Sequence, residues 1–420
     1  MMERYREYKE SGVKWLGEIP SHWEVFRNKD IFHECKKAVG KNSNNYTLLS
    51  LSKKGVVIRN MDDGGKFPAE FDTYKVVEPG DFIFCFFDVD ETPRAVGLSS
   101  EYGMITGAYT VLRQSIANSQ YLYYYYLSID DAKALKPLYT GLRKTVPLNA
   151  FMSMQIFLPP LSEQDAIVRY LDSATSEIDK AIAMQQKMID LLNERKQIII
   201  QNAVTKGLDE NVEMKESGVE WIGRIPKHWE VRRGKFLFRV VNEYSTTGQE
   251  ELLTVSDRTG ITPRSMKNVN MFMSESLIGY KKCQNGDICS NIMWMWHGAV
   301  GVTEYNGVIS PSYGVYRQIA VNYDNKYLDY MLRLPRLVEV YGICSTGLTE
   351  SRLRLYPDDF MNIQFFIPPV EEQKSIVLQI QKQITDIEKS IRNAENLITL
   401  LQERKQIIIN EVVTGKVRVS

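Results

Sequence analysis

The 420-residue sequence has few of the features on which membrane, secreted and disulfide-linked proteins depend. It has no uncharged apolar run near the roughly 18 residues that a membrane span needs, and its first residues, MMERYREYKESG, lack the apolar core of a secretory signal. Its five cysteines form no CxxC pair, which argues against a zinc site and favours reduced core thiols. We therefore expect a cytoplasmic protein without a membrane segment.

Catalytic motifs are missing as well. The sequence contains no GxGxxG fingerprint, no Walker GxxxxGK loop, no HExxH zinc motif and no GxSxG nucleophile motif. The NPPY motif of adenine methyltransferases is also absent, because neither Pro159-Pro160 nor Pro368-Pro369 has the preceding Asn and the following aromatic residue. We expect no catalytic residue, no metal site and no cofactor in this chain, which on its own would not be an enzyme.

An excess of positive charge is lacking too. The 52 Lys and Arg residues are balanced by 52 Asp and Glu residues, and residues 1–158 and 209–367 are each balanced to within one charge. A general nucleic-acid binder is usually basic, since neutralising phosphates drives its non-specific affinity. Any nucleic-acid surface of this chain must therefore be a local patch of cations.

The sequence does contain a long internal repeat. The segment KESGVKWLGEIPSHWEV recurs as KESGVEWIGRIPKHWEV, and weaker echoes include Gly80-Asp81 with Gly286-Asp287. Three near-constant segments recur in the same order: 9–25 as 215–231, 151–168 as 360–377, and 191–205 as 400–414. The chain is therefore two copies of one unit, each with a variable block followed by a near-constant tail. A repeat this long indicates a duplicated pair of domains rather than a solenoid.

The tails predict long amphipathic helices. Their apolar positions recur in alternating steps of four and three, the pattern of a coiled-coil seam. A helix from about residue 162 to 204 would be about 64 Å long. The alternative is an ordinary core helix, but a frame held over eight positions favours two helices that pack on each other. The predicted seam residues are Ile167, Leu171, Ile178, Met188 and Leu192 in the first tail and Ile376, Ile380, Ile387, Leu397 and Leu401 in the second.

The variable blocks have a different pattern. Short apolar runs such as Asp81–Phe87 and Tyr109–Arg113 lie between Gly, Asn and Asp clusters, which is typical of strands and turns. The segments Tyr121–Leu127 and Tyr327–Leu334 indicate a helix that packs on those strands. We predict an α+β fold in four parts: a first domain (1–158), a central helix (159–208), a second domain (209–367) and a C-terminal helix (368–420).

Two kinds of residue are candidates for function. His22-Trp23 and His228-Trp229 each follow Ile-Pro, which favours a structural turn over a ligand-binding role. Cations in turn-rich stretches favour DNA contact, because Arg can bridge guanine O6 and N7 while Asn or Gln can bridge adenine N6 and N7. A solvated loop is the alternative for each of these residues. The DNA-binding candidates are Lys53, Lys54, Arg59, Arg143, Lys144, Arg258, Arg264, Lys267, Asn268, Arg352 and Arg354.

The repeated motifs W-(L/I)-G-x-I-P-x-H-W-E-V and P-P-(L/V)-x-E-Q carry a family resemblance. Through them the chain resembles, over essentially its whole length, the specificity subunit of type I restriction-modification enzymes. Thr140-Gly141 and Thr346-Gly347 resemble the turn before the helix in that family, with Arg143 and Arg352 nearby. An insertion of three residues in the second copy means that these two arginines are not strictly equivalent.

The resemblance implies two similar target recognition domains, each reading one half of a split site in double-stranded DNA. The two tails would pack antiparallel as a coiled-coil spacer with pseudo-two-fold symmetry. They would dock two methylation subunits, which would bring S-adenosylmethionine and methylate adenine. Restriction subunits would bring ATP, Mg and DNA cleavage.

Other classes of protein remain as alternatives. A coiled-coil scaffold would also have such tails, but would not need two large strand-rich blocks with cations in their turns. A self-sufficient methyltransferase or nuclease would need a cofactor loop or metal carboxylates. A specificity subunit of another multi-subunit restriction class could have the same chain organisation.

Overall fold

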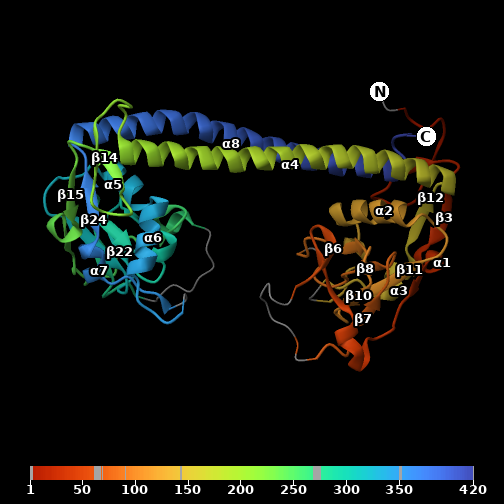
Figure 1. The fold of residues 1–420 in the computed structure, drawn as a ribbon. Coiled ribbons are helices and arrows are strands. Elements are labelled where there is room, and N and C mark those ends of the chain that lie inside the picture. Colours follow the sequence, from red (N-terminus) through yellow and green to blue (C-terminus); the bar gives the residue numbers. More distant parts are fainter. Residues whose placement is uncertain are drawn as a thin grey trace. The chain divides into compact units, whose positions relative to one another are not determined.

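The computed structural model describes residues 3–60, 68, 70–89, 91–141, 144–267, 276–349 and 352–419. The chain forms two compact units (Figure 1). Unit 1 comprises Met1–Gln186 and Ala394–Ser420, and unit 2 comprises Lys187–Asn393. Each unit thus combines one variable block with parts of both tails, whereas the sequence suggested a division into blocks and separate helices.

Unit 1 is an α+β structure, as its alternation of short apolar runs and turns predicts. One sheet has the order β6-β5-β10-β7, in which β5 and β10 are parallel, and a second has the order β4-β11-β8-β9. The strands of these sheets are β4 (Phe32–Glu34), β5 (Thr47–Ser52), β6 (Gly55–Ile58), β7 (Lys75–Val77), β8 (Phe82–Phe84), β9 (Val96–Leu98), β10 (Gly103–Ile105) and β11 (Thr110–Gln114). The remaining elements of the block are β1 (Tyr8–Glu10), β2 (Glu18–Pro20), β3 (Glu24–Arg27), α1 (Asn28–Ile31), η1 (Gly40–Asn45), α2 (Ser119–Asp131), η3 (Lys136–Leu138), α3 (Leu148–Ser153) and β12 (Gln155–Leu158).

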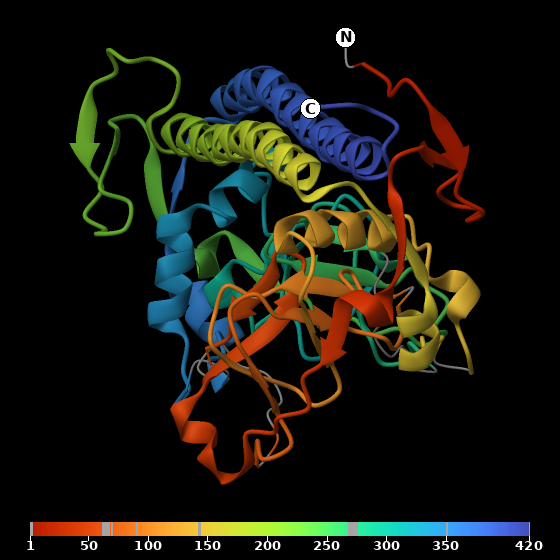
Figure 2. The same ribbon diagram turned by 90° about the vertical axis from the view of Figure 1, so that its right-hand side faces the viewer.

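Unit 2 repeats this topology. Its sheet β16-β23-β20-β21 corresponds to β4-β11-β8-β9, and a parallel bridge from Leu252 to Val308 stands where β5 pairs with β10 in unit 1. Its strands are β13 (Met214–Glu216), β14 (Arg224–Pro226), β15 (Glu230–Arg233), β16 (Phe238–Val240), β17 (Leu253–Ser256), β18 (Gly260–Pro263), β19 (Lys281–Cys283), β20 (Ile288–Ser290), β21 (Val300–Val302), β22 (Gly307–Ile309), β23 (Gly314–Gln318) and β24 (Gln364–Ile367). Its helices are η4 (Gly234–Phe236), η5 (Arg264–Met266), η6 (Met295–His297), α5 (Asn325–Leu332), α6 (Pro335–Cys344) and α7 (Pro357–Asn362). Figure 2 shows the short strands β13 and β14 (light green) at the edge of this unit.

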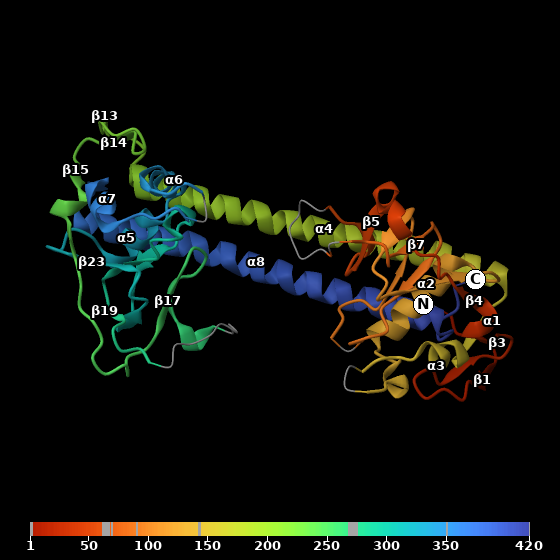
Figure 3. The same ribbon diagram turned by 90° about the horizontal axis from the view of Figure 1, so that it is seen from below.

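The two tails form the long helices α4 (Leu161–Lys206) and α8 (Val370–Val413). Within each unit the two helices lie side by side (Figure 3). The start of one meets the end of the other, so they are antiparallel: Lys405 pairs with Asp179 at 2.7 Å in unit 1, and Lys196 pairs with Glu388 at 2.6 Å in unit 2. The predicted fold class, with two similar α+β domains and two long helices, is confirmed.

Most of the predicted seam residues are buried or half-buried. Ile167, Leu171 and Ile178 are buried on α4, as Ile376, Ile380 and Ile387 are on α8, while Leu192 and Leu401 are half-buried. The prediction is wrong at Met188 and Leu397, which are 45% and 41% exposed. At both places the next residue, Ile189 or Ile398, turns inward instead. A straight helix drifts relative to a seven-residue repeat, and the 11-residue step from Ile178 to Ile189 corrects that drift.

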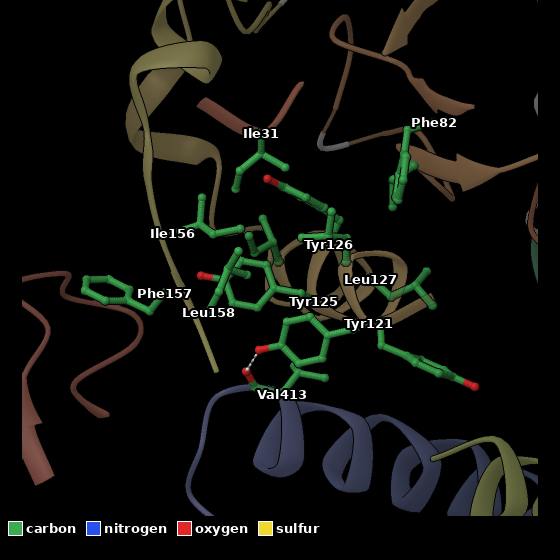
Figure 4. Packing of buried hydrophobic residues seen from close by; sticks show 14 of the residues in the cluster. Ile31, Phe82, Tyr121, Tyr125, Tyr126, Leu127, Ile156, Phe157, Leu158 and Val413 are labelled. Carbon is green, nitrogen blue, oxygen red and sulfur yellow. Dashed lines mark hydrogen bonds between the residues drawn. The ribbon is translucent and has the colours of Figure 1, made fainter. Parts of the chain in front are cut away.

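Each hydrophobic core lies between the sheets, a tyrosine-rich helix and the long helices. In unit 1, Tyr121, Tyr125 and Tyr126 of α2 are buried in one cluster, in which Tyr121 lies beside Val413 of α8 (Figure 4). The Tyr121 hydroxyl donates a hydrogen bond to the Val413 carbonyl over 3.3 Å, and in unit 2 the Tyr327 hydroxyl donates one to the Val204 carbonyl over 2.7 Å. Each block is therefore completed by the end of the other copy's tail.

Candidate nucleic-acid interface

The repeated IP-x-HW motif and the start of the following long helix form one structural joint. In unit 1, a Glu163 carboxylate oxygen lies 2.7 Å from His22 Nε2, and the buried Trp23 indole donates to the other oxygen over 3.2 Å. In unit 2, Glu372 makes the same contacts, 2.7 Å from His228 and 3.2 Å from Trp229. The prediction of a structural turn at both His-Trp pairs is confirmed.

The glutamine of the P-P-x-x-E-Q motif adds a second joint. The Gln164 side chain accepts a hydrogen bond from the Asn118 backbone amide over 2.9 Å and donates one to the Pro159 carbonyl over 2.8 Å. Gln373 bonds the amide of Asp324 and the carbonyl of Pro368 in the same way, over 2.8 Å each. Asn118 and Asp324 cap the N-termini of α2 and α5, so each glutamine ties a domain helix to a long helix.

The weaker Gly-Asp echo corresponds to a buried ion pair in each sheet. Asp81 accepts two hydrogen bonds from the Arg113 guanidinium, over 2.7 and 3.0 Å, and Asp287 accepts two from Arg317, both over 2.7 Å. Both carboxylates are fully buried, and these hydrogen bonds raise the pKa of each arginine. This bidentate geometry is the strongest form of the Arg–carboxylate pair.

The first group of DNA-binding candidates lies on equivalent two-stranded hairpins. Lys53 and Lys54 form the turn between β5 and β6, and Arg258 lies in the turn between β17 and β18. All three side chains are exposed. In unit 2 the Arg333 guanidinium donates to the carbonyls of Asp257 and Arg258, over 2.6 and 2.9 Å, and so fixes the shape of that turn.

Two further candidates occupy equivalent positions, one in the hairpin of each unit. The Arg59 backbone amide donates to the Leu48 carbonyl over 2.9 Å, and the Arg264 amide donates to the Leu252 carbonyl over 2.8 Å. Both arginines directly follow the second strand of their hairpin. Lys267 is half-buried just after η5, and the candidate Asn268 lies outside the described residues.

The remaining candidates lie on the loop before the short helix α3 or α7. In unit 1 this loop closes with paired backbone hydrogen bonds between Thr140 and Thr145, and in unit 2 it closes between Thr346 and Arg354. The extra three residues therefore lie inside the loop. Lys144 and Arg352 are exposed, Arg354 is half-buried, and the candidate Arg143 lies outside the described residues.

The structure adds one functional candidate that the sequence analysis did not select. The loop between β20 and β21 carries Trp294, Trp296 and His297, whose rings stack on one another. Trp294 is 54% exposed, which is unusual for so large an aromatic residue. The WMWH run in the sequence was the available signal, since two tryptophans within three residues outside an amphipathic pattern do not fit a core.

Neither metal ligands nor cavities add a reactive centre to the part of the chain that the structure describes. Among the described residues, no group of three or more His, Cys, Asp or Glu side chains could hold a metal ion, and no helix is long and apolar enough to cross a membrane. Unit 2 has a cavity of about 960 Å³ beside the end of α4, lined in part by Trp221, Arg336 and Gln383. None of the DNA-binding candidates lines it.

The curated relatives that match the chain include the following two. The MjaX type I restriction enzyme specificity subunit of Methanocaldococcus jannaschii is 24% identical over 446 aligned positions, which cover 98% of each chain. The MjaVIII type I restriction enzyme specificity subunit of the same organism is 25% identical over 285 positions, covering 64% of this chain and 63% of the relative. No family model matches the chain.

A solved structure adds a likeness in fold. A chain from work on complex assembly and conformational transition of the type I restriction-modification system superposes with a TM-score of 0.65 and 15% identity. The match covers 94% of this chain and 98% of that chain, so the two share their fold. In sequence, over 98% of its length, the chain is therefore similar to a type I restriction enzyme specificity subunit, and in fold it is similar to a chain of a type I restriction-modification system.

Proposed function

We propose that this chain is the DNA-specificity subunit of a type I restriction-modification complex, in which each unit reads one half of a split DNA site. The observation that carries the proposal is the contrast between the two copies. The His and Trp contacts of Glu163 and Glu372 have the same distances, 2.7 and 3.2 Å, as expected for a shared frame. The cations at the hairpin turns differ, as expected for two half-sites of different sequence.

The hairpins suit this role because a two-stranded ribbon fits the major groove of B-DNA. Their turns carry Lys53 and Lys54 in unit 1 and Arg258 in unit 2, with Arg59 and Arg264 at the far end of the second strand. The long-chain cations can contact phosphates, and arginine can also bridge guanine O6 and N7. The neutral charge of the whole chain is compatible with this role, because the cations needed are local.

Sequencing of methylated sites in cells that carry the chain and its methylation subunits tests this function. Arg59→Ala should relax only one half-site and Arg258→Ala only the other, with about 1–3 kcal/mol lost for each base contact. Lys227→Ala, which removes an exposed cation of unit 2 that pairs with Glu213, is the control. A continuous recognition site, or one variant that alters both halves, would contradict the proposal.

The helices α4 and α8 are proposed to set the spacing of the half-sites. With 46 residues, α4 is about 69 Å long at 1.5 Å per residue, longer than the 34–36 Å of one B-DNA turn. The half-sites should then be separated by several base pairs that no side chain reads. Adding or removing one helical turn in both α4 and α8 should change the spacer length and leave both half-sites intact.

An exposed apolar stripe on each long helix is proposed to dock the methylation subunits. Met188, Leu191 and Ile198 on α4 are 45–55% exposed. Their counterparts Leu397, Leu400 and Ile407 on α8, each 209 positions later, are 41–60% exposed. A surface that recurs with apolar residues at the same three positions fits two copies of one partner, which supports a complex with two methylation subunits.

Mass measurement of the purified complex tests this docking surface. The double variant Leu191→Glu, Leu400→Glu should lose both methylation subunits, and each single variant should lose one. Leu378→Glu is the matched control, because Leu378 is 67% exposed on α8 and its counterpart in the first tail is Arg169. Retention of two subunits by the double variant would place the docking surface elsewhere.

We further propose that S-adenosylmethionine, ATP and Mg bind only to partner subunits, which include restriction subunits. The sequence supports this division through the absence of cofactor and phosphate-binding motifs. The purified chain should then bind neither S-adenosylmethionine nor ATP in calorimetry, and should neither methylate nor cut DNA. Tight binding of S-adenosylmethionine by the isolated chain would contradict this division.

A further inference from the structure

The loop between β20 and β21 in unit 2 presents a stack of three aromatic rings. The His297 ring centre lies 3.8 Å from that of Trp296 and 5.0 Å from that of Trp294, and all three rings lie within 33° of parallel. The buried Met295 anchors the stack, while Trp294 is 54% exposed. The loop therefore holds a flat aromatic face toward solvent.

Backbone hydrogen bonds fix this loop before any ligand arrives. The Asn291 amide donates to the Ala299 carbonyl over 2.9 Å, and the Ala299 amide donates to the Trp294 carbonyl over 3.2 Å. Gly298 supplies the left-handed conformation that closes the turn, with φ of 88°. A rigid aromatic side chain that the core does not bury loses little conformational entropy when it binds a partner.

Positive charge lies beside this aromatic loop. The Leu355 amide donates to the Ile292 carbonyl over 3.0 Å, which joins the aromatic loop to the loop closed by Thr346 and Arg354. That second loop carries the exposed Arg352 and presents Leu348, which is 93% exposed. Rings and cations on adjoining loops are the combination that contacts bases and phosphates together.

Unit 1 differs at the corresponding loop between β8 and β9. There Phe86 is buried, and Phe87 stacks on Tyr109 with ring centres 5.9 Å apart, both rings half-buried. Among the described residues of that loop, 85–89 and 91–95, no aromatic side chain is exposed. The aromatic face therefore belongs to one half of the molecule.

We propose that Trp294, backed by His297 and Trp296, stacks on a base of the second DNA half-site, with Arg352 on a neighbouring phosphate. This inference rests on the proposed function and adds a base-contacting residue to it. Every base has a face on which an aromatic ring can stack, but neighbouring bases cover that face in an intact duplex. Trp294 must therefore act at a base that has lost a neighbour, as happens where an enzyme extrudes a base for methylation.

The test uses the complete methylation complex and duplexes with 2-aminopurine at successive positions of each half-site. Trp294→Ala should weaken binding about tenfold, as expected for the loss of one stacked base. One position of the second half-site should change its fluorescence on binding to wild type and Trp294→Phe, but not on binding to Trp294→Ala. Tyr244→Ala, which removes another exposed aromatic side chain of unit 2, is the control and should match wild type.

Several results would overturn this inference while leaving the proposed function intact. One is equal affinity and equal fluorescence for wild type and Trp294→Ala on a site that both recognise. Another is loss of a methylation subunit from the Trp294→Ala complex, which would make the loop a protein-docking surface. If instead the wild-type complex recognised no split site, the proposed function itself would fail.

Discussion

The two units share their joints and differ in their loops. The contacts of Glu163 with His22 and Trp23 reappear at Glu372 with the same distances, and the buried Asp–Arg pair also recurs. In contrast, the loop before α3 in unit 1 spans six residues and the loop before α7 in unit 2 spans nine. Within the described residues, the ring stack at Trp294 in unit 2 has no equivalent in the corresponding loop of unit 1. Conserved geometry beside divergent loops indicates a frame that was duplicated and whose loops then diverged, as the proposed function requires.

The largest expected effect concerns the buried ion pairs. Asp287→Ala would leave the Arg317 guanidinium without its fully buried partner, so unit 2 should lose about 3–5 kcal/mol of stability. Asp81→Ala should cost less, because the Arg113 side chain is 38% exposed and that of Arg317 only 20%. Urea unfolding monitored by hydrogen exchange in each unit would measure both. Equal losses of unfolding free energy in the two units would contradict the claim that the more buried arginine makes the larger contribution.

The next largest effect tests which residues form the buried seam of the long helices: those seen in the structure or those predicted from the seven-residue pattern. Ile178→Asp places a charge in the buried seam and should cost about 3 kcal/mol. Met188→Asp places the same charge on an exposed position and should change stability by less than about 0.5 kcal/mol. Thermal melting of the two variants would decide between the frames, since the seven-residue frame predicts a large loss at both positions.

A smaller effect is expected at the joint that the two units share. Glu372→Ala leaves the buried Trp229 indole without its acceptor and should cost about 1–3 kcal/mol. Glu163→Ala should cost at least as much in unit 1, because Glu163 accepts hydrogen bonds from both the Trp23 indole and the Tyr5 hydroxyl. Glu371→Ala, at an exposed neighbour of Glu372, is the control for loss of helix-start charge. A loss of unfolding free energy that is larger for Glu372→Ala than for Glu163→Ala would contradict this account of the two joints.

The smallest effect is a dependence on pH. Burial raises the pKa of Asp329, which accepts a hydrogen bond from the Val302 amide and faces Arg333 and Glu304. The unfolded chain therefore loses this proton first as pH rises, and unit 2 should lose stability from about pH 4 upward. Asp329→Asn should flatten this dependence in urea unfolding between pH 4 and 7. If the stability of Asp329→Asn fell more steeply with pH than that of wild type, the predicted direction of the pKa shift of Asp329 would be wrong.

Much of the fold could be predicted because comparison of the two copies shows where each variable block ends and each tail begins. The seven-residue pattern identified α4 and α8, and the tyrosine-rich segments identified α2 and α5. The pattern failed at Met188 and Leu397, because a helix with 3.6 residues per turn cannot keep a seven-residue frame without supercoiling. The sequence also could not show that each core is completed by the other copy's tail, since that contact depends on chain topology.

The candidate site was less predictable. The sequence selected cations in turns, but only the backbone pairing of Arg59 with Leu48 and of Arg264 with Leu252 reveals that the two arginines are equivalent. Trp294 was not selected from the sequence, because a tryptophan codes for no particular degree of solvent exposure. Exposure is a property of the packed structure, and composition does not report it.

A chimera tests most directly the central claim that each unit reads its own half-site. In this chimera the second block, 209–367, is replaced by another copy of residues 1–158, and methylated sites are sequenced in cells that supply the partner subunits. The account predicts a site made of two copies of the first half-site, with the second half-site lost. Retention of the second half-site by the active chimera, or methylation of a continuous site, would contradict it.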